Sequence, residues 1–121
     1  MSFVDKIIER YDLKPNSYDT VHSRNYQIKH DSLITKWTDR ICDGWYGFDL
    51  CNAPESWFGI IDEFLLEIQK IHPTFKILQI KTKYGHLRIY LSLDESLDND
   101  SNVYDYCEKL ESVMFEKKII Y

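Results

Sequence analysis

The chain has 121 residues, a length typical of one domain, and we expect a single domain over residues 1–121. Its formal net charge of −5 disfavours nucleic acid as a partner, because lysine and arginine carry most of the affinity for a phosphate backbone. Three cysteines without a C-x-x-C pair argue against a disulfide scaffold and a zinc knuckle, and no apolar run approaches the roughly 20 residues of a membrane span. These features predict a soluble cytoplasmic protein with no membrane contact and no metal or other cofactor.

The first third of the chain predicts two helices and leaves one segment open. Apolar residues recur at helical spacing from Phe3 to Tyr11, which predicts a helix over residues 2–13. Residues 24–29 alternate between polar and apolar side chains and permit a short strand. Further apolar residues at four-residue steps then predict a helix over about residues 32–42.

The clearest predicted helix follows Pro54, a residue well suited to a first helical turn. Its wide apolar face runs from Trp57 to Ile71, and the dipeptide His72-Pro73 ends it.

A β-hairpin comes next, with strands over residues 75–81 and 86–93 and with Gly85 in the tight turn. Ser101 can cap a last helix, and the apolar terminal segment 119–121 either adds a strand or packs against the core.

This order of elements predicts an α+β fold of two layers, with three to four helices packed on a small antiparallel β-hairpin sheet. A lone hairpin is marginally stable, so the sheet needs a third strand. Residues 24–29, the C-terminus or a second subunit could supply it. The last source leaves a homodimer open.

The hairpin carries the strongest indication of a binding site. Between Ile68 and Leu93 there are five lysine and arginine residues and no carboxylate, whereas Asp94 to Glu116 contains eight carboxylates and one lysine. Arginine presents a planar fork that fits phosphate or carboxylate, lysine adds charge, and tyrosine can stack on a ring. The candidate ligand-binding residues of the hairpin are Lys81, Lys83, Tyr84, His86, Arg88 and Tyr90. The alternative is a solvated sheet face, with Arg88 paired to carboxylates of the last helix.

A second candidate feature is the aromatic loop Trp45-Tyr46-Gly47-Phe48, from which Trp45 joins the candidate ligand-binding residues. A tryptophan after Asp-Gly at a helix end more often fills a core than binds a ligand, so a packing role stays open. The four histidines form no ligand pair. Together with the three cysteines they indicate neither a metal site nor a catalytic residue.

Three stretches in combination resemble a family of small, mostly uncharacterised phage and bacterial proteins: Cys42-Asp43-Gly44-Trp45, Trp57 to Ile68, and Gln79 to Tyr90. That family has a GDGW-like motif, an apolar-faced helix and a hairpin of pattern K-x-K-[FY]-G-x-L-R-x-Y. The positions that match the hairpin pattern are Lys81, Lys83, Tyr84, Gly85, Leu87, Arg88 and Tyr90. The resemblance covers about residues 40–93 and implies a phage or mobile-element origin more than an activity. Cys42 departs from the motif, and only Cys107 stands where many members have a cysteine-rich tail.

These observations predict a small, non-enzymatic, phage-encoded protein that modulates its host or counters a host defence. The basic hairpin would sequester an anionic ligand of nucleotide type or bind an acidic surface of a host protein. An alternative is an acidic mimic, in which the last helix inhibits a host protein by occupying its nucleic-acid-binding groove. A third, less favoured alternative is an enzyme on a phosphorylated substrate, with His86 as acid and base.

Overall fold

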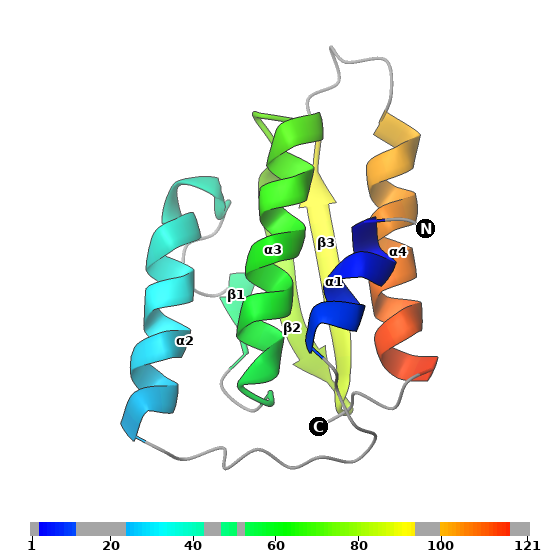
Figure 1. Cartoon of the computed structure of the whole chain (residues 1–121). Helices are drawn as coiled ribbons and strands as arrows, with labels where there is room; N and C mark the ends of the chain where they lie inside the picture. Colours follow the sequence, from blue (N-terminus) through cyan, green and yellow to red (C-terminus); the bar gives the residue numbers. More distant parts are fainter. Residues whose placement is uncertain (1–2, 12–23, 43–46, 51–52, 94–99, 117–121) are drawn as a thin grey trace.

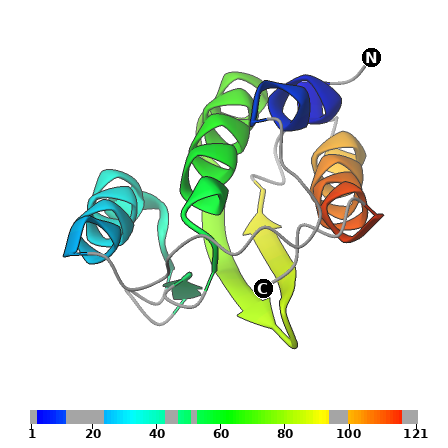
Figure 2. The same ribbon diagram turned by 60° about the horizontal axis from the view of Figure 1, so that its bottom comes forward.

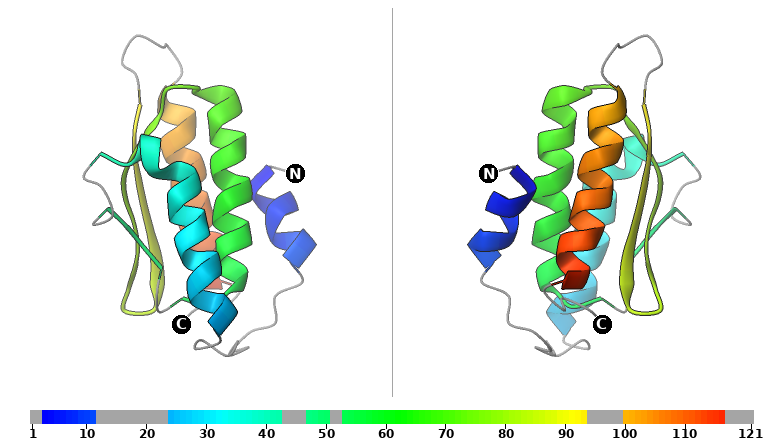
Figure 3. Two further views of the ribbon diagram at one scale, coloured as in Figure 1. Left: turned by 90° about the vertical axis from the view of Figure 1, so that its left-hand side faces the viewer. Right: turned by 90° about the vertical axis from the view of Figure 1, so that its right-hand side faces the viewer.

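The computed structural model describes residues 3–11, 24–42, 47–50, 53–93 and 100–116. Within these ranges the chain forms an α+β fold in which the helices lie on one face of a small sheet (Figure 1; Figure 3). The described helices are α1 (Phe3–Tyr11), α2 (Arg24–Trp37), α3 (Ser56–Ile71) and α4 (Asp100–Glu116), and a short 3-10 helix (Thr38–Arg40) follows α2. The strands are β1 (Phe48–Asp49), β2 (Lys76–Lys83) and β3 (His86–Ser92). The predicted fold class is therefore confirmed.

Helix α3 is the centre of the helical layer, as its sequence pattern predicts. Its apolar face is fully buried from Trp57 to Ile68, and the helix ends at His72, whose N–H is bonded to the carbonyl of Ile68. Helix α1 packs on α3 and α4 on the side away from the sheet (Figure 2). There the ring of Phe3 contacts both Phe64 and Tyr106. The structure therefore confirms the predicted first helix over the residues it describes.

The strand considered for residues 24–29 is wrong, because this segment is the first part of α2. Ile28, which suggested the alternation, is 58% exposed, whereas Tyr26 and His30 are buried at helical spacing. Tyr26 donates a hydrogen bond from its hydroxyl to the carbonyl of Leu50 at 2.9 Å. Tertiary contacts of these two polar-aromatic side chains, which a local pattern does not show, thus fix the helix. The predicted helix over 32–42 forms the rest of α2 and the 3-10 turn.

Strands β2 and β3 form the predicted antiparallel hairpin. Tyr84 and Gly85 make its two-residue turn, with φ of 53° and 81°, the positive values that match the twist of a tight hairpin. In β3 the side chains of Leu87, Ile89 and Leu91 are buried against the helices. The predicted inner face of the hairpin is therefore confirmed.

The third strand is β1, which none of the predicted sources supplies within the described residues. It pairs in parallel with β2, Phe48 beside Ile80 and Asp49 beside Lys81, so the sheet is mixed with order β1-β2-β3. Gly47 permits the approach of β1, since a Cβ atom there would lie 2.8 Å from the carbonyl oxygen of Leu78. The predicted role of residues 119–121 lies outside the described residues. A two-residue strand leaves no alternating pattern in the sequence, which explains why it was not predicted.

Candidate binding surface

The helices lie on one face of the sheet (Figure 3). Because Leu87, Ile89 and Leu91 are buried against them, strand alternation directs Arg88 and Tyr90, with their partner strand's Lys81 and Lys83, to the opposite face. Across the two strands Lys81 lies directly opposite Arg88, and Lys83 lies opposite His86. Like charges that face each other across a sheet destabilise it. The positive charge concentrated on the hairpin therefore does not contribute to the stability of the fold.

The cations of this face also lack the ion pairs that most other described basic residues form. Lys36 lies 2.9 Å from Asp62, Arg10 lies 2.8 Å from Glu63, and Lys109 lies 3.3 Å from Asp5. Within the described residues, no ion pair is found for Lys81, Lys83 or Arg88. Asp49, beside Lys81 in the parallel register, is the nearest acidic neighbour along the sheet. The charge of the hairpin is thus left largely uncompensated.

Tyr84 stands at the tip of the hairpin and is 89% exposed. Its positive φ is a conformation that glycine, asparagine and aspartate adopt at much lower cost than an aromatic residue. Tyr90, on the same outer face and opposite Gln79, is 50% exposed. Two exposed aromatic rings thus accompany the lysines.

His86 and Arg88 occupy the border between this face and α4. The His86 ring lies 5.0 Å from the ring of Phe115, and its buried Nδ1 has no hydrogen-bond partner among the described residues. Arg88, Glu108 and Glu111 line the same cavity, of about 430 Å³. The predicted site therefore divides into an open part, formed by Lys81, Lys83, Tyr84 and Tyr90, and a border part that acidic side chains approach.

Trp45, the remaining predicted site residue, lies outside the described residues. Phe48, the last residue of the same aromatic loop, is buried in the core, as are the aromatic residues Trp57 and Phe58 at the start of α3.

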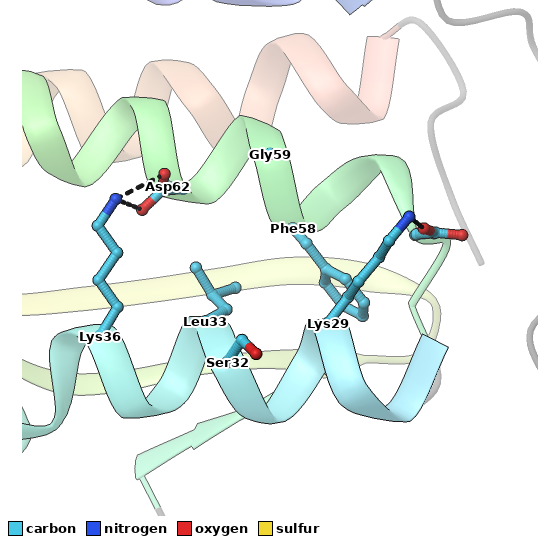
Figure 4. A pocket seen from close by; sticks show the side chains of 8 residues that line it. Lys29, Ser32, Leu33, Lys36, Phe58, Gly59 and Asp62 are labelled. Atoms are coloured by element: carbon cyan, nitrogen blue, oxygen red, sulfur yellow. Dashed lines mark hydrogen bonds and ion pairs between the residues drawn. The ribbon is translucent and has the colours of Figure 1, made fainter. Parts of the chain in front are cut away.

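A further cavity, of about 370 Å³, lies between α2 and α3 (Figure 4). Its middle is apolar, formed by Leu33, Phe58 and Gly59. Two ion pairs close the ends of this cavity: Lys29 of α2 pairs with Glu55, directly before α3, and Lys36 of α2 pairs with Asp62 of α3. Because both of these lysines are neutralised, this cavity offers no site for an anion.

The buried thiol of Cys107 and the buried imidazole of His30 serve the fold. Burial, and secondarily the charge of Glu111, raises the pKa of the Cys107 thiol to about 12, so this thiol stays protonated at neutral pH. His30 is buried and accepts the backbone N–H of Leu50 on its Nε2 at 2.9 Å. No cluster of three or more histidine, cysteine or acidic residues suited to a metal occurs in the described part of the chain. None of its helices combines the length and apolarity that crossing a membrane requires.

One residue near this surface was not predicted from the sequence. Glu111, in the middle of α4, accepts the backbone N–H of Ile89 in β3 at 2.9 Å. An acidic residue on a charged helix gives no local signal of such a contact, because the contact depends on how α4 is placed beside β3.

A comparison of the chain with protein-family models, with curated proteins and with solved structures finds no match. The resemblance to small phage and bacterial proteins therefore stays a prediction.

Proposed function

We propose that this protein is a small non-enzymatic binding protein whose hairpin contacts an acidic surface of another protein. The observation that carries the proposal is Tyr84, an aromatic residue that is almost fully exposed and held at a positive φ between a lysine and a glycine. The turn requires the positive φ but not a tyrosine, and residues held in such costly conformations are concentrated at functional sites. Tyrosine is also among the residues that contribute most to protein interfaces.

The arrangement of the cations favours a protein surface over a free nucleotide. Lys81 and Lys83 project from a strand face, whereas a small anionic ligand needs a concave site that surrounds it. The adjacent cavity is lined by the carboxylates of Glu108 and Glu111, which repel an anion. A broad acidic surface can contact the lysines and Tyr84 at once without entering that cavity.

The same geometry weakens the alternative of an acidic mimic. Glu111, one of the charges that such a mimic would present on α4, is engaged with the backbone of Ile89. If the resemblance to phage proteins holds, the bound protein would be a host factor whose activity is modulated.

The proposal is tested by capture from a host lysate on immobilised wild type and on single variants, with captured proteins quantified by mass spectrometry. We expect a partner that Lys83→Glu and Tyr84→Asn both lose and that added salt weakens. Lys6→Glu is the matched control, because Lys6 is an exposed lysine of α1 that has no ion pair among the described residues.

Tyr84→Asn separates binding from folding, since asparagine fits the positive φ of the turn and should leave the fold at least as stable. Partners that are retained equally by wild type, Lys83→Glu and Tyr84→Asn would contradict the proposal. Calorimetry with ATP tests the nucleotide alternative, and ATP binding that Lys83→Glu abolishes would overturn the choice of a protein partner.

A further inference from the structure

The outer edge of the sheet at β3 presents backbone groups that no strand covers in the described structure. Across an antiparallel pair, residues alternate between positions that are hydrogen-bonded to the partner strand and positions that are not. The two-residue turn makes Lys83 and His86 a bonded pair. By alternation Leu87, Ile89 and Leu91 then direct their N–H and C=O groups away from β2.

Helix α4 runs beside this edge and satisfies it at one point (Figure 1; Figure 2). Glu111 places its Oε1 2.9 Å from the N of Ile89, where the carbonyl oxygen of a neighbouring strand would stand. Among the described residues, the edge groups of Leu87 and Leu91 receive no such bond from a side chain. On both sides of the Glu111 carboxylate, the backbone groups of this edge are therefore available to a further strand.

A groove follows the same edge. Two cavities, of about 470 and 430 Å³, lie between β3 and α4, and both are lined by Glu108 and Glu111. The larger one has an apolar lining that includes Leu78, Leu91 and the half-exposed rings of Tyr90 and Tyr104. Together the two cavities extend along β3 from His86 to Leu91. An extended chain is the backbone shape that fits a groove with a strand edge as one wall.

We propose that this groove takes an extended segment of a partner protein, which adds to β3 as a further strand of the sheet. The segment would replace Glu111 at the N–H of Ile89 and bond to the free groups of Leu91. Successive side chains of the segment point to opposite faces of the sheet, so that every second one, an apolar residue, enters the larger cavity beside Tyr90 and Tyr104. A lysine or arginine of the segment lies beside Glu108 and Glu111 in the larger cavity, because the lining of that cavity includes both carboxylates and no cation, whereas Arg88 lines the smaller one.

Charge repulsion also disfavours a second copy of this chain as the occupant of the groove. Pairing two copies through β3 would bring two α4 helices, each with Glu108 and Glu111, against one shared edge. Like charges at short range oppose that arrangement. The partner segment is therefore basic, which distinguishes this site from the hairpin face and its acidic partner.

The site is tested with a display library of random twelve-residue peptides selected against the wild-type protein. We expect enriched peptides with alternating apolar residues and at least one lysine or arginine. Glu108→Lys should weaken their binding at least tenfold. Asp105→Lys should not, because Asp105 is an exposed acid of the same helix that does not line either cavity.

Backbone pairing has its own readout. N-methylation of an alternate set of peptide amides should abolish binding, and the peptide should shift the amide resonances of Ile89 and Leu91. Failure to enrich any peptide over a bare support would overturn the proposal, as would peptides that bind Glu108→Lys as well as wild type. Lys83→Glu should leave peptide binding unchanged, so this result is independent of the partner of the hairpin face.

Discussion

The two faces of β3 are built from alternating residues of one strand, yet they have different roles. On the inner face Leu87, Ile89 and Leu91 are buried against the helices. On the outer face Arg88 stands opposite another cation and Tyr90 is half exposed. The inner side chains stabilise the fold by burial, whereas Arg88 on the outer face adds repulsion with Lys81 that the fold must offset. Residues that cost stability and persist at the surface are the ones to examine for binding.

The largest expected effect contrasts neighbouring residues of the two faces. Ile89→Ala removes a buried side chain and should lower the free energy of unfolding by about 2–5 kcal/mol. Arg88→Ala should change it by less than about 0.5 kcal/mol and weaken partner binding instead. Urea denaturation of both variants checks the contrast. Equal losses of stability would mean that Arg88 belongs to the structural core.

The contact between α1 and α3 should not accommodate even one added methyl group on α3. A Cβ at Gly59 would clash with the hydroxyl oxygen of Tyr11 and lie 2.8 Å from its ring. Gly59→Ala should therefore destabilise the protein by roughly 1 kcal/mol, because the cost of moving the Tyr11 ring exceeds the gain of about 1 kcal/mol in helix propensity. The double variant with Tyr11→Ala is the control: its loss should be smaller than the sum of the single losses. Additive losses would rule out this contact as the cause.

Alkaline pH should lower the free energy of unfolding through the buried thiol of Cys107. The pKa of this thiol rises from 9.0 to about 12 on folding, chiefly by burial. The unfolded chain thus loses its proton first, so this contribution to stability is complete below pH 9 and falls as the pH rises toward 12. We expect a loss of about 1 kcal/mol between pH 9 and 10. Cys107→Ala should have a flatter pH profile above pH 9, and an unchanged profile would contradict this account.

The smallest effect should have the opposite sign and lie at the hairpin tip. Tyr84→Asn relieves a positive φ and should raise the free energy of unfolding by about 0.5–1 kcal/mol. Thermal unfolding of wild type and Tyr84→Asn measures the difference. Tyr84→Phe, which keeps the aromatic ring and the strain, is the control and should leave stability unchanged. A destabilised Tyr84→Asn variant would show that the tyrosine stabilises the turn through contacts of its own.

The elements that the sequence predicts are those whose signals are local. The apolar periodicity of α3 and the alternation around Gly85 each lie within one element, and both are confirmed. The start of α2 was wrong because the burial of Tyr26 and His30 depends on the segment at Leu50. Strand β1 was not predicted because a strand of two residues is too short to show an alternation of polar and apolar side chains.

The candidate surface shows the same division. The strand period correctly assigns Arg88 and Tyr90 to the outer face, and Gly85 locates the turn. The contact of His86 with Phe115 and the bond from Ile89 to Glu111 join residues that are more than 20 positions apart. Such contacts depend on the placement of α4, which no local pattern encodes.

The parallel pairing of β1 has a consequence for the order in which the protein forms and opens. A hairpin closes through contacts between near neighbours, but β1 pairs with β2 across the long intervening segment that contains α3. We therefore expect β1 to form late and to open in local fluctuations more readily than the rest of the sheet, which amide hydrogen exchange would reveal. Each opening would remove Asp49 from beside Lys81 and leave the basic face, for that moment, with one acidic neighbour fewer.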